Sequence, residues 1–171
     1  MDQHIDQVRK VFKKSGFNDK DIYRLASVLS RLEAEVGTSK CWNVGDVQVL
    51  DKAFTTSHAY HPCYKGKNVN PLVLAIYNIF PDEENGEVML IRKSICKNYH
   101  CMNPRHLFYG DHIDLKIEKW KRKGVNIDKN KYTKVLWMYK NNSKSMSYRK
   151  IANEFDLNYN VVRSICNYER S

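Results

Sequence analysis

Hydrophobic positions in the first 37 residues repeat at the three- and four-residue spacing that is typical of helices. The first predicted helix has its apolar positions at Ile5, Val8 and Phe12. A second helix begins after Asn18, a predicted cap supported by Asp21, and ends at Gly37. The apolar face of this second helix consists of Ile22, Leu25, Leu29 and Leu32. The pattern therefore predicts an N-terminal helical segment, 1–37, whose role is packing.

The pattern of hydrophobic and polar positions changes from residue 41 to residue 81, and a further strand is predicted after it. "VGDVQVL" alternates as a strand does, and "AYHPCYKGKNVNP" is typical of a loop. "PLVLAIYNIF" fits either a helix or a buried strand, whereas "EVMLIRK" predicts a strand. Lys65 and Lys67 lie in the predicted loop between tyrosines and an asparagine, so we expect them to contact phosphate.

Beyond residue 106, "FYG" ends a short predicted strand and a helix follows, capped by Asp111 with Asp114 in support. Gly124 ends this helix, and the apolar stripe is Ile113, Ile117 and Trp120. The other positions are strongly basic: Lys116, Lys119, Lys121, Arg122 and Lys123. A basic helix face of this kind is a candidate for phosphate contacts.

The tail, residues 131–171, predicts three short helices. Ser147 and Asn158 are the predicted caps of the second and third, and "FDLN" is a tight turn between them. The small Ala152 permits close helix crossing, and Asp156 tolerates a left-handed conformation, so a helix-turn-helix is expected. Its groove-facing residues would be Tyr159, Asn160, Arg163 and Ser164. The alternative is a plain helical hairpin that covers the core.

Three residues that can bind a metal follow one another at five-residue steps: Cys96, Cys101 and His106. Structural zinc takes four thiolate or imidazole ligands in a tetrahedron, so a fourth must come from elsewhere. Cys41 and Cys63 are the candidates, and Cys41 is preferred. A site closed by four protein ligands is structural and not catalytic. His58 and His61, near Cys63, form a second, weaker candidate site, and Cys166 is expected to be a core thiol.

Composition and charge narrow the class of protein. The 171 residues include 29 Lys and Arg against 19 Asp and Glu, a formal charge of +10, which points to a polyanionic partner such as nucleic acid. No apolar run reaches the roughly 18 residues that span a bilayer, so no membrane partner is expected. "MDQHIDQVRK" lacks the apolar region of a secretory signal. Five cysteines around a metal motif suit a reducing, intracellular compartment, the cytoplasm or nucleus of a host cell.

The run "SICKNYHCMNPRHL" followed by "FYGDHIDL" resembles the His-Me finger (HNH) nucleases, above all the His-Cys box homing endonucleases and phage HNH proteins. The resemblance is close over residues 94–115 and looser over 41–123. It implies a ββα fold around structural zinc, with an upstream cysteine, often followed by tryptophan as in Cys41-Trp42, as fourth ligand. Phage members of the family often carry a C-terminal helix-turn-helix.

Two positions depart from the family pattern. The catalytic histidine of the family falls on Ser94, and the asparagine that binds the catalytic magnesium falls on Leu115. A serine hydroxyl has no useful basicity near neutral pH, and leucine offers no oxygen to magnesium. His112 and Asp114 are the nearest substitutes for the lost groups. We expect a degenerate, inactive nuclease, with magnesium as a cofactor only if activity survives.

The sequence thus predicts an α+β protein: a zinc-stapled ββα (His-Me finger) domain at 38–124, with the N-terminal helices before it and the helix-turn-helix tail at 131–171 after it. The expected function is regulatory binding of nucleic acid, first of all double-stranded DNA, as in transcriptional control in a phage or virus. Two alternatives stay open. One is an active homing-type DNA endonuclease with relocated catalytic residues, and the other is a structural component of a nucleoprotein assembly, bound to RNA or to an acidic protein. A homodimer is compatible with each.

Overall fold

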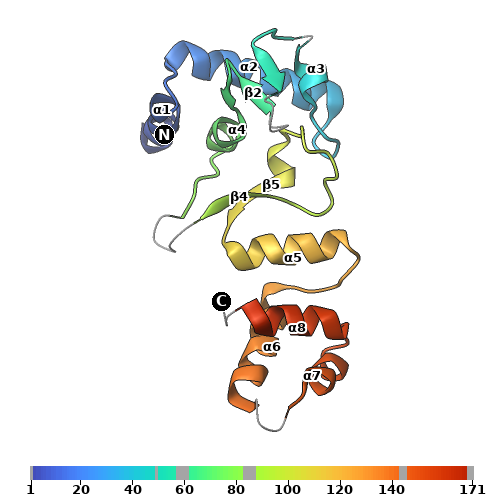
Figure 1. The fold of residues 1–171 in the computed structure, drawn as a ribbon. Helices are drawn as coiled ribbons and strands as arrows, with labels where there is room; N and C mark the ends of the chain where they lie inside the picture. The colour runs from blue at the N-terminus through green and yellow to red at the C-terminus, as the bar shows by residue number, and fades with distance from the viewer. Residues whose placement is uncertain (1, 49, 57–61, 83–87, 143–145, 169–171) are drawn as a thin grey trace. The chain divides into compact units, whose positions relative to one another are not determined.

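The computed structural model describes residues 2–48, 50–56, 62–82, 88–142 and 146–168 (Figure 1). His58 and His61, the second candidate metal site, lie outside these ranges. The chain forms two compact units, Met1–Asp111 and His112–Ser171. The division falls before residue 112, whereas the predicted zinc-binding domain extends to residue 124, and that domain boundary stays a prediction.

The N-terminal unit combines helices with two small antiparallel sheets. The first sheet has the order β1-β2-β3, with Phe54 opposite Tyr64 and Cys63 opposite Asn68. In the second sheet, β4 pairs with β5. The elements are α1 (Asp2–Lys14), α2 (Asp19–Val36), α3 (Val44–Gln48), β1 (Phe54–Thr56), β2 (Pro62–Tyr64), β3 (Lys67–Asn68), α4 (Asn70–Ile76), β4 (Met89–Arg92), the 3₁₀ helix η2 (Pro104–His106) and β5 (Leu107–Gly110).

The predicted start of α2 is confirmed in atomic detail. The Asn18 side chain accepts a hydrogen bond from the Asp21 backbone, and the Asp21 carboxylate accepts one from the Asn18 backbone. Gly37 ends the helix with a φ of +84°, a region that disfavours residues with a Cβ. On α1, Val8 and Phe12 are buried as predicted. The prediction is wrong for Ile5, which is 43% exposed.

Two predictions for the middle of the chain are wrong. "VGDVQVL" contains a helix, α3, because Val44 and Val47 are buried three residues apart and the Asp46 carboxylate caps the Asn43 backbone. The predicted loop contains a hairpin, in which Lys65 and Gly66 join β2 to β3. Both residues have positive φ, +47° and +79°, as two-residue hairpin turns require. The ambiguous apolar run forms α4.

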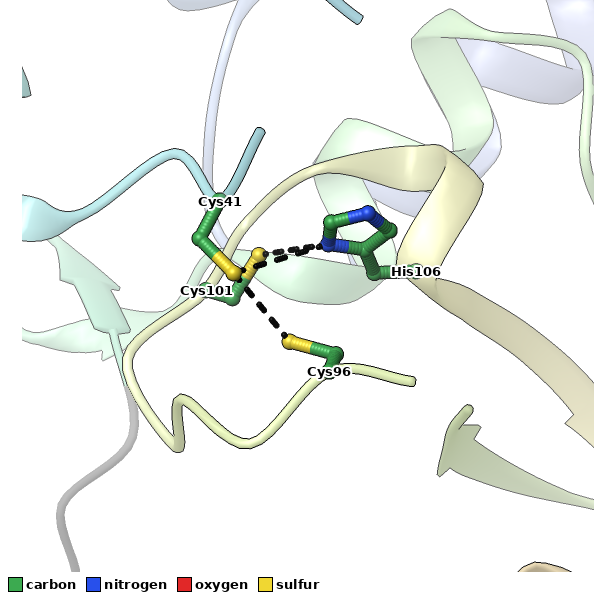
Figure 2. Close-up of side chains that lie close together, drawn as sticks. All are labelled: Cys41, Cys96, Cys101 and His106. Carbon is green, nitrogen blue, oxygen red and sulfur yellow. Dashed lines mark hydrogen bonds between the residues drawn. The ribbon is translucent and has the colours of Figure 1, made fainter. Parts of the chain in front are cut away.

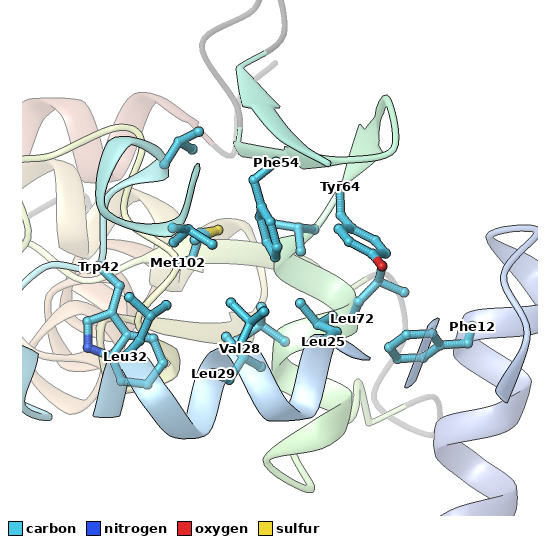
Figure 3. Packing of buried hydrophobic residues seen from close by; sticks show 14 of the residues in the cluster. Phe12, Leu25, Val28, Leu29, Leu32, Trp42, Phe54, Tyr64, Leu72 and Met102 are labelled. Atoms are coloured by element: carbon cyan, nitrogen blue, oxygen red, sulfur yellow. The ribbon is translucent and has the colours of Figure 1, made fainter. Parts of the chain in front are cut away.

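A hydrophobic core joins the helices α1 to α4 and the strands β1 and β2 of this unit. Figure 3 shows side chains of α1, α2, α4 and β2 meeting around it, together with Trp42 and Met102 from the segments that carry the metal-ligand residues. Two buried carboxylates at the edge of this core are each paired: Asp51 accepts two hydrogen bonds from Arg24, at 2.5 and 2.7 Å, and Asp21 accepts one from Lys65. Burial of these charges is tolerated because each has a partner.

The C-terminal unit is all helical and has its own core. Its elements are α5 (His112–Arg122), α6 (Lys129–Asn142), α7 (Tyr148–Glu154) and α8 (Tyr159–Tyr168). The predicted caps are confirmed, since Ser147 accepts from the Lys150 backbone and Asn158 from the Asn160 backbone. Ile127 is 1% exposed, so the segment between α5 and α6 contributes to the core. The core includes Ile117, Tyr132, Val135, Ile151, Ala152, Val162, Ile165 and Cys166.

The mixed α and β character is confirmed, but its finer description is not. Elements β4, β5 and α5 follow one another in the expected order, yet α5 belongs to the other unit, so the ββα finger stays a prediction. The same holds for the helix-turn-helix. Among the described residues, no helix combines the length and the apolar character needed to cross a membrane.

We expect the two cores to respond separately to mutation. Ile165→Ala should lower the free energy of unfolding of the C-terminal unit by about 2–5 kcal/mol, the usual cost of a buried cavity. Leu29→Ala should do the same to the N-terminal unit. Amide hydrogen exchange measures both, because each variant should accelerate exchange only in its own unit. Equal acceleration of α2 and α8 by either variant would contradict separate cores.

Candidate metal centre and basic helical unit

Four residues that can bind a metal, three cysteines and one histidine from three segments, meet in the N-terminal unit (Figure 2). Cys96 follows β4, in a turn closed by its own backbone N–H on the Lys93 carbonyl at 3.0 Å. Cys101 precedes η2, and His106 is the last residue of that helix. Cys41 comes from the distant segment between α2 and α3.

The distances between their donor atoms suit a single ion. Cys41 Sγ lies 3.6 Å from Cys96 Sγ and 3.7 Å from His106 Nδ1, and Cys101 Sγ lies 3.4 Å from the same nitrogen. All four donor atoms fall within 4.8 Å of one another. A tetrahedron with 2.3 Å metal–sulfur bonds has edges of about 3.8 Å, so a metal ion fits between them. The preference for Cys41 is confirmed, because Cys63 lies in β2 and is not part of the cluster.

Hydrogen bonds hold the distant Cys41 segment against the other three residues. The Asn103 amide, fully buried, donates to the Thr38 and Lys40 carbonyls at 2.8 and 2.7 Å, while its oxygen accepts from the Arg105 backbone. The Met102 backbone donates to the Trp42 carbonyl at 2.9 Å. The backbone around the cluster is therefore fixed by interactions other than the ligand side chains.

The protonation of the cluster depends on a cation. Burial raises the pKa of the Cys101 thiol to about 12, and burial together with the Cys96 thiol raises that of Cys41. Burial lowers the pKa of His106, against the effect of a hydrogen bond to the Ser39 backbone. Without an ion, the neutral forms of Cys41, Cys101 and His106 are favoured. An ion reverses this balance for the thiols, so binding releases protons.

The cluster offers four protein ligands and leaves no position for a substrate or water in a tetrahedral site. This arrangement suits a structural ion. A catalytic ion would need an open coordination position, which this set does not provide.

The two positions at which the resemblance would place catalytic residues of HNH nucleases are occupied by Ser94 and Leu115. Ser94 lies in the turn after β4, and Leu115 lies on α5, half-buried. Of the candidate substitutes, His112 is exposed at the start of α5, and Asp114 forms an ion pair with Lys129 at 3.0 Å. Ser94 belongs to the N-terminal unit and the other three to the C-terminal unit.

Lys65 and Lys67, which are predicted to contact phosphate, each donate a hydrogen bond within the protein. Lys65 Nζ donates to the buried Asp21 carboxylate at 2.5 Å, and Lys67 Nζ donates to the Ser15 carbonyl at 2.5 Å. Both contacts fix the β2–β3 hairpin to the corner between α1 and α2. The sequence pattern did not reveal this because the acceptors lie more than 40 residues away.

The candidate nucleic-acid residues of the C-terminal unit lie largely at its surface. On α5 and just after it, Lys119, Arg122 and Lys123 are exposed, while Lys116 is half-buried and its pKa is lowered by burial and by Lys119. On α8 the predicted groove-facing residues are exposed, and Val162, Ile165 and Cys166 are buried. The exposed α8 positions are Tyr159, Asn160, Arg163 and Ser164.

Sequence reasoning missed the Asn103 contacts and an aromatic row in the C-terminal unit. Tyr148 lies between Tyr139 and Tyr159, with ring centroids 5.3 and 6.1 Å away, and its hydroxyl donates to the Asn167 side chain at 3.1 Å. The sequence signal at position 103 is the Asn103-Pro104 dipeptide, which indicates a bend in the chain but not the side-chain hydrogen bonds.

No family model, curated protein or solved structure matches the chain.

We expect Cys41→Ala to abolish metal binding and Cys63→Ala to leave it intact. Both thiols are in the N-terminal unit, but only Cys41 offers a donor atom to the cluster. Elemental analysis of the purified variants, with a thermal melt of each, measures the difference. Metal retained by the Cys41 variant and lost by the Cys63 variant would show that the cluster has been assigned wrongly.

We expect Lys65→Met to lower the free energy of unfolding at pH 7, because it removes the ion pair with Asp21. The loss should be only about 1 kcal/mol, because solvent screens a half-exposed ion pair. Burial raises the pKa of Asp21, but the hydrogen bonds from Lys65 and from the Asn18 backbone lower it below its usual value. A lowered carboxylate pKa stabilises the fold above about pH 4, and this is lost as the pH falls through the folded-state pKa. The difference between variant and parent should therefore shrink in acid.

Chemical denaturation between pH 3 and 7 measures this effect. Lys52→Met, which removes an exposed lysine of the same unit, is the matched control and should change little. If the Lys65 variant kept its stability but bound nucleic acid more weakly, the result would support the prediction that Lys65 contacts phosphate.

Proposed function

We propose that this chain is a zinc-stabilised nucleic-acid-binding protein derived from an HNH endonuclease, without nuclease activity and with a regulatory role on double-stranded DNA. Zinc is the proposed ion because three thiols and one imidazole are its usual structural ligands. The C-terminal unit is the proposed DNA-binding part.

The partition of charge between the two units carries this proposal. Residues 112–171 contain 14 Lys and Arg against 6 Asp and Glu, a net charge of +8. Residues 1–111 contain 15 against 13, a net charge of only +2. A strongly basic small helical unit attracts a polyanion, and DNA affinity comes largely from such phosphate neutralisation.

The exposed face of α8 supports base contacts in addition to phosphate contacts. A short helix, a turn with Asp156 at a φ of +48°, and a second helix around a shared core are the features of a helix-turn-helix. The second helix of that motif presents its N-terminal residues to the major groove. Tyr159, Asn160 and Arg163 occupy these positions in α8 and are exposed.

The absence of nuclease activity is proposed from the residues at the family's two catalytic positions. The Ser94 hydroxyl does not accept a proton near neutral pH, and the Leu115 side chain offers no oxygen to magnesium. Asp114 is engaged by Lys129, which argues against its use as a metal ligand. The metal cluster has no open coordination position for catalysis.

We expect the protein to shift labelled duplex DNA in a salt-sensitive manner and to leave supercoiled plasmid intact with magnesium or manganese. Arg163→Ala should weaken binding by about 1–3 kcal/mol if Arg163 contacts a base edge. Arg31→Ala, which removes an exposed arginine of the N-terminal unit, is the charge-matched control.

Native and denaturing gels of the same reactions separate the outcomes. Nicking that requires the added ion would establish an active nuclease and refute the proposed loss of activity. Tighter binding to structured RNA than to duplex DNA, with Arg163→Ala neutral, would favour a structural component of a ribonucleoprotein instead.

A further inference from the structure

The segment that carries three of the four metal-ligand residues has an unusual charge. Residues 88–110 contain no Asp or Glu, whereas Arg92, Lys93, Lys97 and Arg105 are all basic. The rest of the N-terminal unit is correspondingly acidic, because the whole unit has a net charge of only +2. The net positive charge of this unit thus comes from residues 88–110, because the basic residues elsewhere in the unit are outnumbered by acidic ones.

Two large apolar side chains are exposed in the same segment. Ile95 is 74% exposed and Tyr99 is 65% exposed, on either side of the buried Cys96 and ahead of the buried Cys101. Neither contributes to the hydrophobic core of the unit. We call residues 93–101 the zinc loop. Figure 2 shows the chain leaving Cys96, turning, and returning to Cys101.

Hydrogen bonds fix the backbone of the zinc loop. The Asn98 amide donates to the Asn43 side chain, and its oxygen accepts from the His100 backbone at 2.8 Å. Metal-ligand residues lie at both ends of the turn, at Cys96 and Cys101. The exposed Tyr99 therefore extends from a backbone that is held on both sides, which reduces the entropy lost when a ligand contacts it.

Tyr99 also has a cationic neighbour. The Arg92 guanidinium lies 5.9 Å from the centre of the Tyr99 ring, and one of its nitrogens donates to the Cys101 carbonyl at 3.4 Å. A guanidinium beside an exposed aromatic ring, with lysines at 93 and 97, combines a stacking surface with phosphate-binding charge.

We propose that the zinc loop binds an unpaired nucleotide, with the base stacked on Tyr99 and the neighbouring phosphates held by Arg92, Lys93 and Lys97. The inference rests on the proposed function and specifies a second contact, in the N-terminal unit. A paired base within a duplex does not offer its face to an aromatic side chain, so the ligand is a single-stranded end, gap or bulge. The absence of acidic residues from 88–110 favours a polyanion over a protein partner.

Fluorescence anisotropy with two probes tests this contact. One probe is a blunt 20-base-pair duplex, and the other is the same duplex with a six-nucleotide single-stranded overhang. Full-length protein should bind the overhang probe more tightly. Tyr99→Ala should weaken binding to the overhang probe by between about 5-fold and 150-fold, as base–aromatic stacking implies, and leave the blunt duplex unaffected.

Three control variants make the result specific. Tyr99→Phe retains the ring and should retain the overhang preference, as should Tyr99→Trp. Tyr23→Ala removes a tyrosine of similar exposure, 71%, from α2, and should change binding to neither probe. Equal metal content in all variants excludes an indirect effect on the cluster.

The outcomes separate this inference from the proposed function. Binding to the blunt duplex that depends on Arg163, without any effect of Tyr99→Ala on the overhang probe, overturns the zinc-loop contact alone. Binding to neither probe overturns both proposals. Loss of overhang binding in Tyr99→Ala but not in Tyr99→Phe or Tyr23→Ala supports the zinc-loop contact.

Discussion

The meeting of Cys41 with Cys96, Cys101 and His106 is the constraint on which the N-terminal unit depends. Strands β4 and β5 are four residues each, and a two-stranded sheet of this size is marginally stable alone. The cluster joins the segment after β4 to the segment between α2 and α3. Trp42 and Met102, from the same two segments, are both buried in the hydrophobic core. A bound ion would add to this the free energy of coordination, on the order of 10 kcal/mol.

The cluster does not stand alone, because the buried Asn103 amide holds the backbone on both sides of it. Its two donated bonds reach the carbonyls of residues 38 and 40, immediately before Cys41. A buried amide with all of these partners positions the distant ligand without using the thiols themselves. Hydrogen bonds thus position the ligand residues. The interactions of the folded chain offset the entropy that is lost when these residues are brought together.

The two units differ in physical character as well as in sequence. The N-terminal unit has a metal cluster, paired buried carboxylates and almost balanced charge, whereas the C-terminal unit has a purely helical core and most of the net charge. Separate cores allow stability and polyanion attraction to be supplied by different parts of the chain. The zinc loop is an exception within the N-terminal unit, since it combines basic residues with an exposed aromatic ring.

The sequence by itself determined the features that depend on neighbours a few residues apart. The capping box at Asn18, the caps at Ser147 and Asn158, the core positions of α2 and α8 and three metal ligands at fixed spacing all follow from local geometry. Tertiary structure decided what depended on distant partners. The sequence favoured Cys41 over Cys63 as the fourth ligand, but only the folded chain brings Cys41 to the other three residues. Lys65 and Lys67 met acceptors in the N-terminal helical segment, and Val44 and Val47 became helical. In a short segment, the position of the surrounding core outweighs the weak difference between helical and extended patterns, and only the folded chain fixes that position.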